Sequence, residues 1–171
     1  MFSNCAYIDS PLVDFEDRSR PLVVASCGTY RMISLPQFHT LRNFGRKDYQ
    51  ILYIASGSGH FFIDGEEYMV SAGNMVFYQP GEFNNYIYYS ADKTEVFWIH
   101  FTGSAVKEIL GRYEFPMDSH IFHTGVSSEF SSIFLRIIRE IQGRKPDFEE
   151  FISLKLQELL ILSRRHRAAN N

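Results

Sequence analysis

The chain has 171 residues, of which 45% are hydrophobic and 16% aromatic, so it can form one domain with a sizeable core. Its formal net charge of −3 at pH 7 gives no overall reason to expect binding to nucleic acid. Two cysteines far apart in the sequence, Cys5 and Cys27, argue against a disulfide framework and a CxxC zinc site, and no apolar run approaches the ~20 residues of a membrane-spanning helix.

The first 21 residues carry Pro11, Pro21 and several acidic side chains between isolated hydrophobic residues. This composition predicts an N-terminal arm, which is ordered only if it packs on another part of the protein. The arm lacks the basic and then apolar pattern of a secretory signal, so we expect a soluble, cytoplasmic protein with no membrane contact.

Residues 22–103 alternate short β-prone runs with turn signals such as Asp64-Gly65 and Pro80-Gly81. Asp-Gly suits a tight hairpin because both residues tolerate a positive φ. Strands at this regular spacing indicate an all-β barrel or sandwich. Residues 37–48 are polar and basic and are not assigned to a strand. The expected strands cover residues 22–25, 29–35, 49–55, 60–63, 67–70, 75–78, 85–89 and 95–101.

Helical spacing replaces strand alternation after Gly103. Residues 104–110 can form a short helix, and residues 129–142 have apolar side chains on one helical face, with Ser128 as a possible cap and Gly143 as the end. A last helix, at about 147–167, is apolar on more than one face. Such a helix is buried against both its own domain and something else. Packing on the barrel and a subunit interface both remain open at this point.

The turn-spaced block fits the sequence frame of the cupins, whose barrels hold a metal through His and Glu side chains. Three glycines of the frame are matched, by Gly57 at the end of its first motif and by Gly73 and Gly81 in its second. The four ligand positions are instead taken by Phe44, Arg46, Gln50 and Asn84. Amide, guanidinium and phenyl groups are poor ligands for a divalent transition metal, so we expect no metal and no other cofactor.

The amino-acid sequences of three segments resemble the effector-binding domain of AraC-family bacterial transcription regulators. These segments are DYQILYIASGSGHFFIDGEEY, QPGEFNNY and FWIHFTG. The resemblance implies a cupin barrel followed by helices, the last of which pairs with its counterpart in a dimer. It also implies that DNA is bound by helix-turn-helix modules, which these 171 residues do not contain. We expect the chain to be a fragment of a regulator, with a stand-alone sensor domain as the alternative.

The same resemblance implies ligand contacts at Arg42, Asn84, Tyr86 and Trp98. Arginine presents fixed donors for hydroxyl or carboxylate oxygens, and tryptophan presents a flat apolar face. Asn84 stands where the sugar-binding member of the family has histidine, so the effector need not be a sugar. A plain core position for Trp98 and a solvated loop position for Arg42 are the structural alternatives.

Further interior candidates are Tyr30, Gln50 and His100. On the strand 95–101, alternation places Trp98 and His100 on one face, and the resemblance turns that face inward. A lone histidine on a strand is more often structural than catalytic, and we assign no catalytic residue. His120 and His123 are expected on the surface.

The predicted fold is mostly β with C-terminal α: a cupin-like antiparallel β-barrel (jelly roll) followed by a helical dimerisation subdomain. The arm covers residues 1–21, the barrel 22–103 and the helical part 104–171. The predicted dimer contacts are Ile152, Leu156, Leu159 and Leu160.

The predicted function is that of an effector-sensing domain of a transcription regulator. It binds a small molecule, with carbohydrate as one class, and changes the geometry of a homodimer. DNA is a partner only through the helix-turn-helix part. The alternatives are a metal-independent cupin enzyme, such as a sugar epimerase or isomerase, and a carbohydrate-binding module without regulatory output.

Overall fold

The computed structural model describes residues 1–10 and 14–170. The helices in these ranges are α1 (Val106–Arg112), α2 (Ser128–Gly143), α3 (Phe148–Ala169) and a short 3₁₀-helix at Ser90–Asp92. The strands are β1 (Phe2–Tyr7), β2 (Val23–Arg31), β3 (Gln37–Arg42), β4 (Tyr49–Ser56), β5 (Ser58–Ile63), β6 (Glu66–Ser71), β7 (Asn74–Tyr78), β8 (Asn84–Tyr89), β9 (Glu95–Thr102) and β10 (Ile121–His123).

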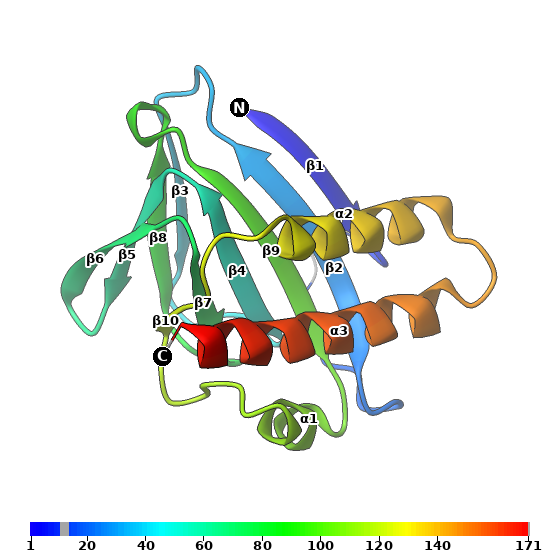
Figure 1. Cartoon of the computed structure of the whole chain (residues 1–171). Helices are drawn as coiled ribbons and strands as arrows, with labels where there is room; N and C mark the ends of the chain where they lie inside the picture. Colours follow the sequence, from blue (N-terminus) through cyan, green and yellow to red (C-terminus); the bar gives the residue numbers. More distant parts are fainter. Residues whose placement is uncertain (11–13, 171) are drawn as a thin grey trace.

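The strands form two antiparallel sheets that face each other (Figure 1). One sheet has the order β1-β2-β9-β4-β7-β10 and the other has the order β3-β8-β5-β6. The predicted mostly-β, cupin-like architecture with C-terminal helices is confirmed. Closure into a barrel is not seen in the described ranges, because no strand of one sheet is hydrogen-bonded to a strand of the other.

Alternation along β9 sends neighbouring side chains into two separate cores. Phe97, Ile99 and Phe101 belong to the core that includes the helices, whereas Val96 and Trp98 belong to the core between the sheets. The sheet that contains β9 is therefore apolar on both faces. This explains why the alternation alone could not show which face of the strand is the inner one.

Helices α2 and α3 lie side by side across the outer face of the six-stranded sheet (Figure 1). The N-cap of α2 is Ser127, whose hydroxyl accepts a hydrogen bond from Glu129 N at 3.1 Å, so the predicted cap was one residue too late. The helix ends at Gly143 as predicted, and Arg144 follows with a left-handed φ of 48°. All six buried residues of α2 are hydrophobic, and they are Phe130, Ile133, Phe134, Ile137, Ile138 and Ile141.

The four residues predicted to form a dimer interface face the core of their own chain. Each is at most 1% exposed, and all belong to the core that α2, α3 and the six-stranded sheet share: Ile152, Leu156, Leu159 and Leu160. Their assignment as dimer contacts was wrong, because a side chain buried within the single chain has no surface left for a partner. Leu154 lies on the opposite face of α3 and is 58% exposed.

The predicted N-terminal arm contains a strand. β1 pairs with β2 in antiparallel register, with Cys5 opposite Gly28. The Arg144 guanidinium donates to Tyr7 O at 3.0 Å and to Ile8 O at 2.6 Å, which ties the end of β1 to the turn between α2 and α3. The part of the predicted arm at residues 11–13, including Pro11, lies outside the described residues.

Besides β1, two strands were missed because their sequences are short or polar. β3 (QFHTLR) lies in the segment that was read as polar and basic, and its side chains alternate between exposed and partly buried. β10 has three residues. His120 precedes β10, and its side chain is 31% exposed, with Nδ1 2.9 Å from Phe77 O, while His123 is exposed as predicted.

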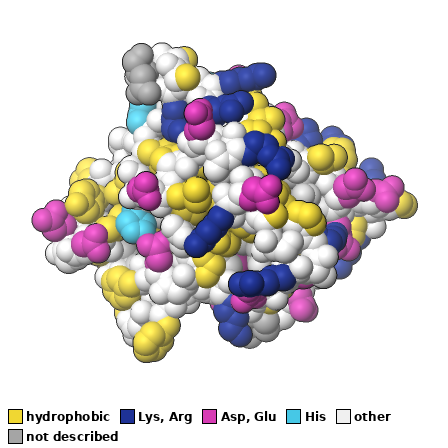
Figure 2. Space-filling model, turned by 90° about the horizontal axis from the view of Figure 1, so that it is seen from below, with side chains coloured by type: hydrophobic (Ala, Val, Ile, Leu, Met, Phe, Trp, Pro, Cys, Tyr) yellow, Lys and Arg dark blue, Asp and Glu magenta, His cyan; other side chains and the backbone are white. Residues whose placement is uncertain are grey.

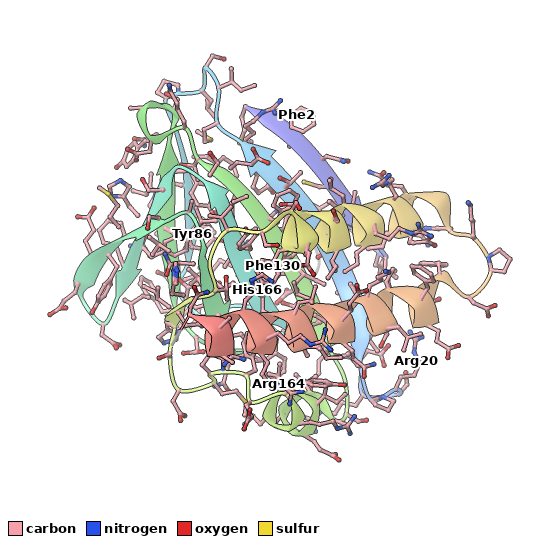
Figure 3. All side chains as sticks on the ribbon, viewed as in Figure 1. Phe2, Arg20, Tyr86, Phe130, Arg164 and His166 are labelled. Atoms are coloured by element: carbon pink, nitrogen blue, oxygen red, sulfur yellow. The ribbon has the colours of Figure 1, made fainter. Side chains whose placement is uncertain are left out.

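The C-terminal part of α3 is held against the rest of the domain. The His166 ring lies 4.8 Å from the Phe130 ring, and both are labelled in Figure 3. Arg164 donates to Arg112 O at 3.4 Å, and Arg167 donates to Glu114 O at 3.0 Å. None of the helices in residues 1–10 and 14–170 is both long enough and apolar enough to cross a membrane.

Candidate functional site

A cavity of about 160 Å³ lies between the two sheets. Because liquid water takes up ~30 Å³ per molecule, this volume corresponds to about five waters. It is below the ~300–1,000 Å³ of pockets for drug-sized ligands, so the cavity suits a small molecule. Its lining residues come from β1, β2, β3, β4, β8 and β9 and from Arg46, and they are Tyr7, Tyr30, Phe38, Thr40, Arg42, Arg46, Gln50, Leu52, Tyr86, Tyr88, Trp98 and His100.

Most of the predicted ligand contacts converge on this cavity. Six of the seven are in its lining: Tyr30, Arg42, Gln50, Tyr86, Trp98 and His100. The seventh, Asn84, is buried beside it and accepts a hydrogen bond from Arg42. The structure therefore brings together residues that the sequence separates widely, while their role in binding stays a prediction.

A chain of hydrogen bonds joins three strands at one end of the cavity. Arg42 Nη1 donates to Asn84 Oδ1 at 3.3 Å and to Tyr86 OH at 3.4 Å. Gln50 Nε2 donates to the same Tyr86 hydroxyl at 3.3 Å. Tyr86 lies on β8 within the two-sheet region (Figure 3). These separations are longer than the ~2.7–3.2 Å typical of N–H···O hydrogen bonds, so the bonds are weak.

Several buried polar atoms of the cavity wall have no hydrogen-bond partner within the described residues. They are Gln50 Oε1, Tyr88 OH, Trp98 Nε1 and His100 Nε2, and the nearby Tyr78 OH has none either. A buried polar atom without a partner costs ~1–3 kcal/mol, and most buried polar atoms in proteins are paired. Water or a polar ligand in the cavity can pair these atoms.

Arg46 lines the cavity and forms an ion pair with Asp48, which is not part of the lining. Its Nε and Nη2 donate to the two carboxylate oxygens at 2.7 and 3.0 Å, and the Asp48 side chain is fully buried. Burial raises the pKa of Asp48, while the Arg46 guanidinium acts in the opposite direction. The pair fixes Arg46 in the wall and neutralises its charge locally.

His100 is a neutral group of the wall. Burial, and then the positive charges of Arg46 and Arg42, lower its pKa well below the usual range. Its Nδ1 lies 2.9 Å from Ser26 Oγ, and Nε2 is the unpartnered atom. A neutral imidazole can donate or accept one hydrogen bond at Nε2, according to its tautomer.

Trp98 lies against Gly28 on the neighbouring strand β2, which it opposes directly in the β2–β9 register. A Cβ on Gly28 would lie 2.5 Å from Trp98 Cζ2, so the position has no room for any other residue unless the indole moves. The Tyr7 and Tyr30 rings contact the indole at centroid distances of 5.9 and 6.0 Å. These contacts hold the ring in one orientation at the wall.

Sequence reasoning missed part of the wall. Tyr7 comes from the predicted arm, and Phe38 and Thr40 come from the unassigned strand β3. Every second residue of β3 lines the cavity, but three residues are too few to give a clear period. Arg46 was considered only as a metal-ligand position, and Tyr88 was treated only as part of a strand.

Three of the four positions that the cupin frame assigns to metal ligands lie in or beside the cavity, and Phe44 lies apart from them. Phe44 is 90% exposed, Arg46 is paired with Asp48, and Gln50 and Asn84 lie in or beside the cavity. Within residues 1–10 and 14–170, no cluster of three or more His, Cys, Asp or Glu side chains is arranged to hold a metal ion.

A larger groove, of about 570 Å³, lies on the surface between α1, α3 and the segment before β2. The ion pair between Arg20 Nη2 and Glu149 Oε2, at 2.6 Å, lies in its wall, and further charged side chains line it. Arg20 is labelled in Figure 3, at the end of the molecule away from Tyr86. Four buried unpartnered atoms belong to the lining of the smaller cavity and none to that of the groove within the described residues, so the smaller cavity is the candidate site.

Comparisons with known proteins agree with this fold. The family model described as AraC-like ligand binding domain matches residues 33–160. An apo variant of ToxT from Vibrio cholerae strain SCE256 is similar over 91% of this chain and 59% of its own, with 12% identity and a TM-score of 0.53. At that identity the likeness shows the fold alone. This chain spans 59% of the length of that ToxT chain.

Two further solved structures are less similar. ToxT from Vibrio cholerae O395, bound to (E)-4-(8-methylnaphthalen-1-yl)but-3-enoic acid, matches 76% of this chain and 52% of its own with 12% identity and a TM-score of 0.49. YhaK from Escherichia coli matches 74% of this chain and 52% of its own with 12% identity and a TM-score of 0.46. Among curated proteins, no sequence matches this chain.

Proposed function

Because this chain belongs to the family of AraC-like ligand binding domains, we propose that it senses a small effector in the cavity between its sheets and so regulates transcription. In this proposal the effector acts without a metal ion, and a sugar is one candidate class. The proposal assigns the contact with DNA to a helix-turn-helix part, as membership of the family implies, and not to this domain.

The observation that supports the proposal most is the set of buried, unpartnered polar atoms around one cavity. A structural core of this size is expected to pair its polar atoms internally. A ligand that pairs them stabilises the domain by mass action, since it binds the folded chain only.

Binding is proposed to act through the strands at the open edge of the sandwich. Tyr7 on β1 is part of the wall, and Arg144 between α2 and α3 binds the carbonyls of Tyr7 and Ile8. A ligand that contacts Tyr7 would favour the docked arrangement of β1 over alternatives, which is the differential binding that a switch requires. A homodimer through the exposed face of α3, where Leu154 lies, is the proposed route to the DNA-binding part.

The charged side chains on one face of the molecule bear on the contact with DNA. On the face seen from below, acidic and basic side chains are interspersed (Figure 2). Binding of a phosphate backbone uses a continuous basic patch or stripe. This face therefore gives no support for a contact with DNA.

The rival function, a metal-independent epimerase or isomerase, needs an acid and a base that face the substrate together. His100 is the one imidazole of the wall within the described ranges, and its Nδ1 lies 2.9 Å from the Ser26 hydroxyl rather than beside a carboxylate. The wall also has no Asp or Glu side chain in those ranges. The arrangement supports binding better than proton transfer.

The test is a screen of small metabolites for an increase in melting temperature, repeated with two variants of β3. Thr40 lines the cavity, whereas Leu41 on the other face of the strand is 52% exposed. Thr40→Phe should fill the cavity and abolish the ligand-induced shift, while Leu41→Phe should keep it. A ligand shift that survives Thr40→Phe would place the binding site elsewhere.

A further inference from the structure

We propose that the cavity selects a small carboxylate with a flat or apolar body, its carboxylate group bound at Arg42, in preference to a neutral sugar. This inference rests on the proposed function, because it names the class of effector for the same cavity.

The charge of the wall is the first argument. Arg46 is neutralised by Asp48, but Arg42 forms no ion pair in residues 1–10 and 14–170. Asp14, another acid of this region, lies outside the cavity lining and accepts a hydrogen bond from Lys47 N. A half-buried cation without a counter-ion is stabilised by an anionic ligand and left uncompensated by a neutral one.

The unused donors of Arg42 are the second argument. Both of its hydrogen bonds to the protein leave from Nη1, at 3.3 and 3.4 Å. The guanidinium group has five N–H donors in a fixed plane, so a pair of parallel donors remains for the two oxygens of a carboxylate. A sugar hydroxyl pair can accept from the same donors, but it adds no charge to the interaction.

The hydrogen-bond donors and acceptors of the cavity wall also favour a carboxylate over a sugar. Trp98 Nε1 can only donate, and burial raises the pKa of Tyr88 well above its usual value, so that this hydroxyl keeps its proton. Gln50 Oε1 is the one unpartnered atom of the described wall that can only accept. A polyol brings several hydroxyl protons that need acceptors, whereas a carboxylate brings acceptors alone.

Aromatic rings make up half of the lining and define the rest of the ligand. They are Tyr7, Tyr30, Phe38, Tyr86, Tyr88 and Trp98. Rings at a wall favour a flat or apolar body that can stack on them. The volume of about 160 Å³ limits that body to a small ring or a short chain.

Isothermal titration with matched pairs tests the class. The probes are 2-furoate against 2-furamide, valerate against valeramide, and xylose as a neutral polyol. Each acid and its amide have nearly the same shape, so a difference between them reports the charge. Since a hydrogen bond to a charged group is stronger than a neutral one, we expect at least one acid to bind about tenfold or more tightly than its amide.

Substitutions of Arg42 test whether this residue causes the preference for the acid over its amide. Arg42→Gln should abolish the difference between acid and amide, and Arg42→Lys should keep part of it because the positive charge remains. Arg139→Gln is the control, because Arg139 is exposed on α2 and bonds only to Leu135 O at 3.3 Å. It should leave the preference unchanged.

The outcomes separate this inference from the proposed function. Equal affinity for acid and amide, or an acid preference that survives Arg42→Gln, would overturn the carboxylate class. Xylose binding that Thr40→Phe removes would refute the class but support the cavity as the effector site. Failure of every probe would also count against the class, while the metabolite screen would still test the cavity.

Discussion

Gly28 shows how a single residue shapes the cavity wall. Its Cα lies under the indole of Trp98, and an added Cβ would come within 2.5 Å of Cζ2. Gly28→Ala should lower the free energy of unfolding by ~1–3 kcal/mol, as overpacking of a buried site does. Urea unfolding measures the change.

A second glycine provides the control for this prediction. Gly111 lies in α1, and a Cβ there would meet no atom within 4 Å. Gly111→Ala should be neutral or stabilise by up to ~1 kcal/mol, because alanine favours the helix. Equal effects of the two substitutions would show that the indole does not lie against Gly28.

His100 should make stability depend on pH in the acidic range. Its folded-state pKa is lowered well below 6.5, so the unfolded chain binds more protons as the pH falls below that value. Stability is therefore full above the unfolded pKa and is lost as the pH falls. His100→Gln should flatten the slope of unfolding free energy against pH between about pH 6.5 and 5, by up to ~1.4 kcal/mol per pH unit.

His60 should make the stability depend on pH with the opposite sign, and at higher pH. Its contacts with Glu67 and Asp92, at 2.7 and 2.9 Å, raise its pKa above 6.5 against the effect of burial, so its contribution is present at low pH and is lost as the pH rises through the folded value. His60→Gln should change the slope of unfolding free energy against pH above pH 6.5 and leave the slope at acidic pH unchanged.

For His100, an unchanged slope at acidic pH in His100→Gln would contradict the assignment of a neutral buried imidazole.

At the scale of elements, β1 depends on a contact from the helical part. Arg144 donates to the carbonyls of Tyr7 and Ile8, and Gln142 Nε2 donates to Asn4 Oδ1 at 2.9 Å. Arg144→Ala should speed amide hydrogen exchange in β1 by about tenfold, because loss of charged hydrogen bonds lowers the local opening energy. Arg139→Ala should not, and equal exchange in both variants would show that β1 is held by its pairing with β2 alone.

Helix α3 has a buried face and an exposed face that mutations can separate. Leu156 is fully buried, whereas Leu154 is 58% exposed. Leu156→Ala should cost ~2–5 kcal/mol of stability, and Leu154→Ala should stay within ~0.5 kcal/mol. Chemical denaturation measures both values.

The same helix tests the proposed homodimer. Leu154→Glu should keep the fold and shift sedimentation towards a monomer, because a charge at the centre of an apolar contact is left unpaired. A folded Leu154→Glu variant that sediments as the original chain does would exclude this face as the interface.

For the whole molecule, the strands of the two sheets were predictable where turn signals bounded them. The hairpin at Asp64-Gly65 joins β5 to β6 as expected, and both residues have a positive φ. β1 and β3 were not predictable from local pattern. Both are edge strands, and their sequences alternate less clearly because each buries only part of one face.

The residues of the cavity were predictable only in part. The family resemblance pointed to Arg42, Tyr86 and Trp98, and the structure brings them to one wall. Tyr7 and Gly28 could not be found this way, because their place depends on the pairing of β1 with β2 and of β2 with β9. The over-apolar α3 was misread for a similar reason: burial by α2 and the sheet accounts for the leucines that were assigned to a partner.

The central claim is that the effector lies in the inter-sheet cavity, and the most direct test uses its tryptophan. Trp98 is the only tryptophan of the chain, so its indole N–H gives a single resonance in a ¹H–¹⁵N spectrum. This proton belongs to an unpartnered buried atom of the wall. We predict that a bound effector moves this resonance in a saturable way, with the dissociation constant that calorimetry gives. A ligand that binds by calorimetry but leaves the indole resonance in place would contradict the claim.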